Sequence, residues 1–191
     1  MARLTVPAEV KILLEGYVST ESGGRSCSTI SLVRDGALKI VCDPGTANSA
    51  EVIEKALAKE RLDADGINVV FITHNHMDHH RFTGLFRKAK ILDFYGWWDK
   101  DACSECGGFV SENIHLIKTP GHSHDSVSLI VETAEGIVAV CGDVFWKQGF
   151  PKRDPYACDL KKLAASRKKI LEIADFVVPG HGETFKAKKW P

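Results

Sequence analysis

A dense group of histidines and an aspartate follows a short apolar run near the middle of the chain. Residues 67–72, Ile-Asn-Val-Val-Phe-Ile, are mostly β-branched or aromatic and predict a buried strand. Residues 73–80 then read Thr-His-Asn-His-Met-Asp-His-His. Imidazole and carboxylate groups suit zinc, iron and manganese, and so short a loop brings four of them together only by turning tightly. We therefore predict a loop that binds two adjacent metal ions at the C-terminal end of a strand.

The remaining histidines follow the same pattern. The sequence contains eight histidines, and seven of them fall in three short places. Two of these places are 120–124, Pro-Gly-His-Ser-His, and 179–182, Pro-Gly-His-Gly, each after an apolar run. Only His115 stands apart. This clustering beside glycines argues against histidines that serve only in packing or solvation.

These motifs resemble the metal-binding motifs of the metallo-β-lactamase superfamily. The matching pieces are His-x-His-x-Asp-His at 74–79, Gly-His at 121–122, Gly-Asp at 142–143 and Gly-His at 180–181. The second half of the chain looks most like the metallo-β-lactamase-domain-containing protein 1 group. The resemblance implies an α+β fold, the four-layer αββα sandwich of two facing sheets with helices outside. The pattern of apolar residues alone predicts only a mixture of α and β structure.

The resemblance also implies a dinuclear site. It divides six ligands between two metal ions: His74, His76 and His122 for the first, and Asp78, His79 and His181 for the second. Asp143 would bridge the two ions. We expect two divalent ions, with zinc favoured over iron or manganese.

Two further residues are candidates for the surroundings of the metal ligands. Asp43 ends a predicted strand in Cys-Asp-Pro-Gly, and its carboxylate could accept the outer N–H of a ligand histidine or merely organise the turn. The resemblance favours the first role. His124, two residues after His122, is either an outer hydrogen-bond donor or substrate contact, or a structural residue of its loop.

The resemblance implies an enzyme that hydrolyses its substrate with a metal-bridging hydroxide. A pair of divalent ions lowers the pKa of a shared water to near neutrality, and Asp78 and Asp143 are the carboxylates expected to take part in catalysis. An aspartate at position 143 is usual in hydrolases of phosphodiesters and thioesters, whereas zinc β-lactamases generally carry cysteine or serine there. We therefore expect a ribonuclease-like phosphodiester hydrolase, with β-lactam hydrolysis as a side activity.

Three alternatives remain open. The first is a small-molecule hydrolase of a thioester, lactone or lactam, although the chain lacks the extra helical domain with which glyoxalase II holds glutathione. The second is a mononuclear iron enzyme like the persulfide dioxygenases, which use two histidines and an aspartate. The third is a binding module without catalysis, which the complete ligand set disfavours.

Composition limits the partners. The 191 residues fit one domain, 1–191, and the 25 lysines and arginines balance the 25 aspartates and glutamates. A net charge of zero gives no overall attraction to nucleic acid or membrane, which counts against RNA as the substrate. The substrate class, a small molecule or a nucleic acid, is left open. No apolar stretch approaches the roughly 20 residues of a membrane span, and the N-terminus lacks a signal-peptide core, so we expect a cytoplasmic protein without membrane contact.

In a reducing compartment the six cysteines are not expected to form disulfides. Cys27, Cys42 and Cys141 fall in or beside predicted strands and are expected in the core. Cys103 and Cys106 form a Cys-x-x-Cys pair whose role, metal binding or redox chemistry, is left open.

The remaining elements follow from apolar periodicity and turn residues. The other predicted strands are 10–18, 27–34, 38–42, 90–94, 114–118, 127–132, 136–140 and 176–178. The predicted helices are 160–173 and one that begins after Asn48 or Ser49 and ends near Lys59. Residues 19–26 and 95–108 are predicted to be loops, and in the resembling family the first of them lies over the metal site. Trp97 and Trp98 in the second loop are candidates for a pocket wall or for the contact of a homodimer.

Overall fold

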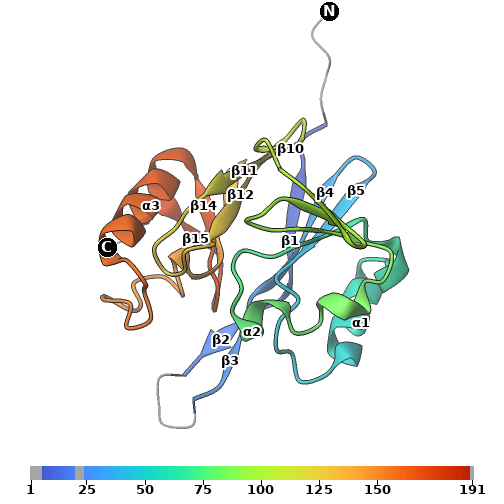
Figure 1. Cartoon of the computed structure of the whole chain (residues 1–191), viewed down its shortest axis with the longest axis horizontal. Helices are drawn as coiled ribbons and strands as arrows, with labels where there is room; N and C mark the ends of the chain where they lie inside the picture. The colour runs from blue at the N-terminus through green and yellow to red at the C-terminus, as the bar shows by residue number, and fades with distance from the viewer. Residues whose placement is uncertain (1–5, 20–23, 190–191) are drawn as a thin grey trace, which may run out of the picture.

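Two β-sheets lie face to face, and a long helix covers the outer side of each (Figure 1). The structure is a computed structural model that describes residues 6–19 and 24–189 of the chain. One sheet has seven strands and the other has six, while a further pair of short strands forms a separate ribbon. This arrangement is the predicted four-layer αββα sandwich.

The sheets are built from consecutive halves of the chain. The seven-stranded sheet contains, in spatial order, β1 (Glu9–Leu14), β4 (Ile30–Asp35), β5 (Leu38–Cys42), β6 (Val69–Phe71), β7 (Lys90–Leu92), β8 (Trp97–Asp99) and β9 (Ala102–Ser104). The six-stranded sheet contains β10 (Phe109–Ser111), β11 (Ile114–Lys118), β12 (Val127–Thr133), β13 (Gly136–Val140), β14 (Phe176–Val178) and β15 (Phe185–Lys186). The ribbon consists of β2 (Tyr17–Val18) and β3 (Ser26–Cys27). The helices are α1 (Ala50–Lys59), the single-turn α2 (Met77–His80) and α3 (Leu160–Ile173).

Strands with two apolar faces hold the layers together. In β6, Val69 and Phe71 point into the core between the sheets, whereas Val70 packs with Ile53 and Leu57 of α1. The alternation follows from the twofold side-chain period of a strand, and the central strands are buried on both faces. The six-stranded sheet is covered in the same way by α3.

Most of the predicted elements are present. The helix 160–173 coincides with α3, whose N-cap Asp159 accepts hydrogen bonds from the backbone N–H groups of Lys161 and Lys162. Ser49 is the N-cap of α1, as predicted. The predicted hairpin at Asp35-Gly36 is formed by β4 and β5.

The predicted strand 10–18 is wrong, because the structure divides it between β1 and β2, which belong to different sheets. Gly16 lies at the break, where an added Cβ would stand 2.4 Å from the backbone nitrogen of Thr29. Only a residue without a side chain fits this close to the backbone of residues 27–29. Of the predicted loop 19–26, Ser26 belongs to β3, and residues 20–23 lie outside the described residues.

The predicted loop 95–108 is also wrong in part, since it contains the hairpin of β8 and β9 at the edge of the seven-stranded sheet. Trp97 packs on the core between the sheets. Trp98 donates a hydrogen bond from Nε1 to Asp93 Oδ1 at 3.0 Å. Both tryptophans are half-buried within their own domain. Along the described parts of the chain, no helix has the length and apolar character needed to cross a membrane.

The C-terminal ends of the central strands lie at the edge where the predicted metal ligands are found. β5, β6 and β7 are parallel to one another, as are β13 and β14. Because parallel strands end at the same edge of a sheet, the segments after β5, β6, β13 and β14 meet at one edge of the sandwich. The short helix α2 lies at this edge, close to the ribbon of β2 and β3 (Figure 1).

Asp35, the last residue of β4, joins the two sheets. Its carboxylate accepts hydrogen bonds from Ser111 Oγ at 2.6 Å and from Asn113 Nδ2 at 2.8 Å, and both donors belong to the six-stranded half. Partial burial raises the pKa of Asp35, but these hydrogen bonds outweigh it and set the pKa below its ordinary value.

We expect Asp35→Ala to lower the free energy of unfolding by about 1–3 kcal/mol, because charged hydrogen bonds between the sheets are lost. The pKa of Asp35 is lower in the folded protein than in the unfolded chain, so its ionised carboxylate stabilises the fold at pH values above the pKa of the unfolded chain. This contribution should fade as the pH falls from about 5 to about 3. Urea unfolding at several pH values measures both effects. Asp99→Ala, which removes an exposed ion pair with Lys90, is the control and should change stability by less than about 0.5 kcal/mol. An equal loss in both variants would contradict the assignment.

Candidate metal centre

All of the predicted ligand side chains lie at the shared edge of the two sheets. Among the described residues, three overlapping groups have ligand atoms within 4.8 Å of one another: His74, His76 and His122; His74, His79 and Asp143; and Asp78, His79 and His181. The first and third groups match the division that the sequence predicts. The second joins them through Asp143.

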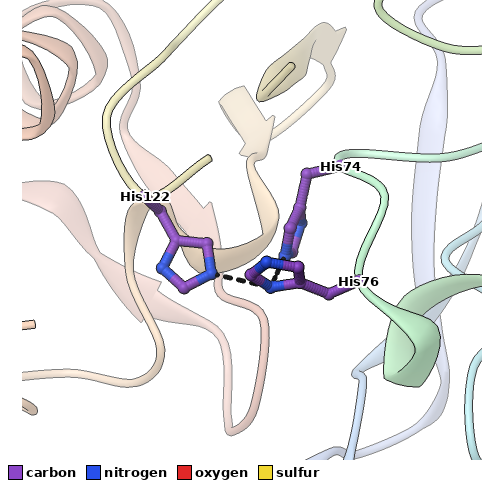
Figure 2. Close-up of side chains that lie close together, drawn as sticks. All are labelled: His74, His76 and His122. Carbon is purple, nitrogen blue, oxygen red and sulfur yellow. Dashed lines mark hydrogen bonds between the residues drawn. The ribbon is translucent and has the colours of Figure 1, made fainter. Parts of the chain in front are cut away.

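Three imidazole rings form the first group. His74 and His76 come from the segment after β6, and His122 reaches them from the loop after β11 (Figure 2). His76 Nδ1 lies 3.0 Å from His74 Nε2 and 3.1 Å from His122 Nε2. His74 and His122 are each 2% exposed, whereas His76 faces solvent. The cluster is therefore open on the side of His76.

The turn of α2 positions the other group. His76 is extended and caps the helix, so Asp78 and His79 project from the first turn back toward the cluster. The carbonyl oxygen of Asp78 accepts hydrogen bonds from the backbone N–H groups of Ser28 and Thr46. His181 Nε2 lies 3.6 Å from Asp78 Oδ2. Asp78 thus lies between the buried histidines His79 and His181 and the open side of the cluster at His76.

Asp143 lies between the two groups, on a turn after β13. Its oxygens are 3.4 Å from His79 Nε2, 3.4 Å from His122 Nε2 and 3.2 Å from His181 Nε2. The residue is 5% exposed. Gly180 makes room for it, because an added Cβ there would lie 1.8 Å from Asp143 Oδ1. A carboxylate in this position can bind cations on both sides.

Outer hydrogen bonds orient the histidines of the seven-stranded half. His79 Nδ1 lies 2.8 Å from Asp43 Oδ2, and Asp43 also accepts hydrogen bonds from the backbone N–H and the hydroxyl of Thr73. The hydroxyl of Thr73 in turn lies 3.1 Å from His74 Nδ1. Since that hydroxyl donates to Asp43, it accepts from His74. In their neutral forms both rings therefore carry their proton on Nδ1 and hold the inner Nε2 as a lone pair.

The six-stranded half uses two other acceptors. His122 Nδ1 lies 2.7 Å from Asp154 Oδ2, and His181 Nδ1 lies 2.9 Å from the carbonyl oxygen of Cys27. A carbonyl oxygen can only accept, so the Nδ1 proton of His181 faces outward and its Nε2 lone pair faces the cluster. His122 likewise donates its Nδ1 proton to the carboxylate of Asp154, so its Nε2 lone pair faces the cluster.

The electrostatics of the site favour added positive charge. Burial lowers the pKa of His74 well below its ordinary value and also lowers the pKa of His76, which keeps both rings neutral. Burial also acts to lower the pKa of His79, yet the carboxylates of Asp143 and Asp43 raise it well above the ordinary value. Burial acts to raise the pKa of Asp143, but His181 and His79 hold it well below the ordinary value. Two buried carboxylates thus attract a cation to this half.

These residues fit divalent metal ions. His79 Nε2 and Asp143 Oδ1 are buried and have no hydrogen-bond partner among the described residues. Four histidines direct lone pairs into a space that also holds ionised carboxylates, which is the donor set of zinc and related ions. The inner nitrogen atoms of His74, His76 and His122 lie about 3 Å apart, and those that carry lone pairs cannot donate hydrogen bonds to one another. They are well placed as ligands.

The structure places the two predicted outer residues differently. Asp43 contacts His79, as described above. His124 is exposed, and its Nδ1 lies 3.6 Å from Cys158 Sγ, which fits the structural alternative. A contact between His124 and substrate stays a prediction.

Sequence reasoning missed Thr73, Asp154 and the carbonyl of Cys27 as orienting groups. Thr73 directly precedes the ligand motif, which was a usable signal. Asp154 has none, because no spacing rule connects it to His122, 32 positions away.

The six cysteines carry free thiols, and Cys27, Cys42 and Cys141 are buried as predicted. Cys103 is exposed and Cys106 is half-buried. Neither contributes to the three ligand groups found among the described residues.

Asp154 offers a direct test of the outer hydrogen bonds. We expect Asp154→Asn to weaken metal binding about 10–100-fold, because an amide N–H in place of the carboxylate favours the His122 tautomer that is protonated at the inner Nε2. Competition with a chromophoric chelator measures the affinity. Asp159→Asn, at the N-cap of α3, is the control and should leave metal affinity unchanged. Equal affinities in Asp154→Asn and the unsubstituted protein would contradict an orienting role.

Comparison with known proteins agrees with this geometry. A family model described as the metallo-beta-lactamase superfamily matches residues 23–92. The chain is 30% identical to metallo-beta-lactamase domain-containing protein 1 of Xenopus laevis, over 96% of this chain and 83% of that protein. It is also 30% identical to a Methanocaldococcus jannaschii protein described as a probable metallo-hydrolase, over 94% of this chain and 90% of that protein.

The fold has counterparts among solved structures. A metallo-beta-lactamase family protein of Thermus thermophilus superimposes with a TM-score of 0.70 at 15% identity, over 95% of this chain and 76% of that one. Identity this low supports the similarity of fold alone.

Proposed function

We propose that this chain, which belongs to the metallo-beta-lactamase superfamily, holds two zinc ions and hydrolyses phosphodiester bonds. That it is a metal-dependent hydrolase follows from its family and from the relative described as a metallo-hydrolase. The number and identity of the metals and the substrate class are the parts we propose.

The observation that carries the proposal is the position of Asp143. One buried carboxylate lies within 3.4 Å of inner nitrogens of His79, His122 and His181, which come from both halves of the cluster. Seven ligands exceed what one tetrahedral zinc accepts, and a shared carboxylate allows two cations to bind side by side. When bound, such a pair supplies a hydroxide nucleophile near neutral pH and stabilises negative charge on the substrate oxygen.

Phosphodiesters fit this arrangement for a geometric reason. Pairs of cations a few ångströms apart suit in-line displacement at phosphorus, in which attacking and leaving oxygens lie on opposite sides. The open side of the cluster at His76 and Asp78 leaves access for a substrate.

The side chains of the chain have separate tasks in this proposal. The four orienting acceptors, which are Thr73, Asp43, Asp154 and the Cys27 carbonyl, keep protons on the outer nitrogens of the histidines. Asp78 is 22% exposed, and its carboxylate can accept a proton from the attacking water and return it to the leaving group. His74, His79, His122 and His181 exclude water from the inner side because they are buried.

Two measurements test the proposal. Mass spectrometry of natively purified protein should find two zinc ions per chain. The same preparation should hydrolyse bis(p-nitrophenyl) phosphate and short RNA or DNA oligonucleotides faster than a thioester, a lactone or a β-lactam. Faster turnover of a thioester or lactone would show that the substrate is not a phosphodiester and would assign the enzyme to small-molecule hydrolysis. A single iron ion per chain would instead indicate the mononuclear alternative.

A further inference from the structure

A groove lies between the loop at residues 152–154 and α3, and none of the predicted metal ligands lines it. Its volume is about 620 Å³, within the range of small-molecule sites, roughly 300–1,000 Å³. The helix α3 forms one wall on the outer side of the six-stranded sheet (Figure 1). Asp154 is the one lining residue that the hydrolase proposal uses, through its contact with His122.

Four cationic side chains line it: Lys152, Arg153, Arg167 and Lys168. Arg167 donates a hydrogen bond from Nε to the carbonyl of Val144 at 2.8 Å, and its guanidinium lies 5.7 Å from the centre of the Phe145 ring, so these contacts fix its orientation. Lys152 and Arg153 approach from the loop, and Lys168 from the helix. The cations therefore come from both walls.

Two carboxylates also line the groove, and both are engaged. Asp154 bonds His122 Nδ1 through Oδ2, and through Oδ1 it accepts the backbone N–H of Tyr156. Glu172 lies 3.8 Å from Lys168 in an exposed pair, which contributes little. The excess of four cations over two carboxylates makes the groove a favourable place for an anion.

The remaining lining is apolar. It consists of Leu160, Leu163, Ala164 and Leu171, all from α3. Leu160 is 40% exposed. Leu163 is already buried, whereas Leu160 and Ala164 are exposed and Leu171 is half-buried. An inorganic anion would leave these three uncovered, whereas a ligand with an apolar body would bury them.

We propose that this groove binds an organic phosphate, with the phosphate held by Lys152, Arg153, Arg167 and Lys168 and its apolar body placed on the leucines of α3. Arginine and lysine together suit phosphate, because the guanidinium offers paired donors and the ammonium a compact charge. The body is either a planar base, as in a nucleotide, or an alkyl chain, as in a lipid phosphate. The proposal does not depend on the reaction at the metal centre.

Isothermal titration calorimetry of the metal-loaded protein with AMP, octyl phosphate and inorganic phosphate tests the site. We expect one of the organic phosphates to bind at least five-fold more tightly than inorganic phosphate. Lys168→Ala, and the double variant Lys152→Ala with Arg153→Ala, should each weaken its binding about five-fold or more. Preference for AMP or for octyl phosphate identifies the source of the ligand.

Lys169→Ala is the matched control, because Lys169 is the next residue on the same helix, is exposed, and does not line the groove. It should bind within two-fold of the unsubstituted protein. Phosphate bound at the metals would respond equally to both lysine substitutions, so the difference between them reports the groove. Equal affinities in Lys168→Ala and Lys169→Ala, or equal binding of inorganic and organic phosphates, would overturn the proposal.

Turnover of bis(p-nitrophenyl) phosphate by the same variants separates this site from the hydrolase proposal. We expect it to be unchanged in Lys168→Ala and Lys169→Ala. Absent turnover in all proteins, with groove binding intact, would count against the hydrolase and not against the groove.

Discussion

Asp143→Asn is expected to reduce turnover of a phosphodiester by about 10³-fold or more and to lower the metal content below two ions per chain. The asparagine has the same shape, but it carries no charge and presents an N–H to one of the two halves of the site. The buried carboxylate at 5% exposure is therefore replaced without a change in packing. Metal content by mass spectrometry and steady-state turnover measure the two effects, and circular dichroism should show an unchanged fold.

Cys103→Ser is the control for this result, because Cys103 is exposed and lies outside the ligand groups. Its metal content and turnover should equal those of the unsubstituted protein. Retention of full activity by Asp143→Asn would remove the observation on which the dinuclear proposal depends.

The second large effect is expected at Asp43. This carboxylate accepts hydrogen bonds from His79 Nδ1 and from two groups of Thr73, all between 2.7 and 2.8 Å. In Asp43→Asn the amide N–H would oppose the Nδ1 proton of His79 and shift that proton to the inner Nε2. We expect metal affinity to fall about 10–100-fold. Asparagine tolerates the backbone φ of +49° at this position, so the fold should be retained.

Asp43→Ala should add a loss of stability to the loss of metal affinity. Buried donors of Thr73 and His79 would be left without an acceptor, and alanine is strained at positive φ, so we expect a loss of about 3 kcal/mol or more. Urea unfolding and chelator competition separate the two quantities. An exposed substitution, Asp99→Asn, should change neither. Unchanged metal affinity in both Asp43 variants would show that His79 is oriented by other groups.

The sequence predicted the long and strongly patterned elements well. The helix α3 and the strands β5, β11 and β13 have the predicted bounds, because buried faces require apolar residues at fixed spacing. The short strands β8 and β9, of which β9 is the edge strand of its sheet, were missed. All three residues of β9, Ala102–Ser104, are exposed, although the strand pairs with β8. A strand without a buried face needs no alternation of apolar and polar residues, so the sequence carries no signal for it. The layer order was available only from the resemblance to a family.

The sequence by itself determined which side chains gather at the site. Whether a side chain can bind a metal ion depends only on its residue type. The ligands also follow strands that the pattern of apolar residues predicts, so the sequence places them at the ends of those strands. Only the tertiary structure decided how these ligands are oriented. His122 depends on Asp154, 32 positions away, and His181 on a backbone carbonyl 154 positions away. A carbonyl is common to every residue, so no residue type marks it, and the packing of the two sheets alone brings it to its histidine.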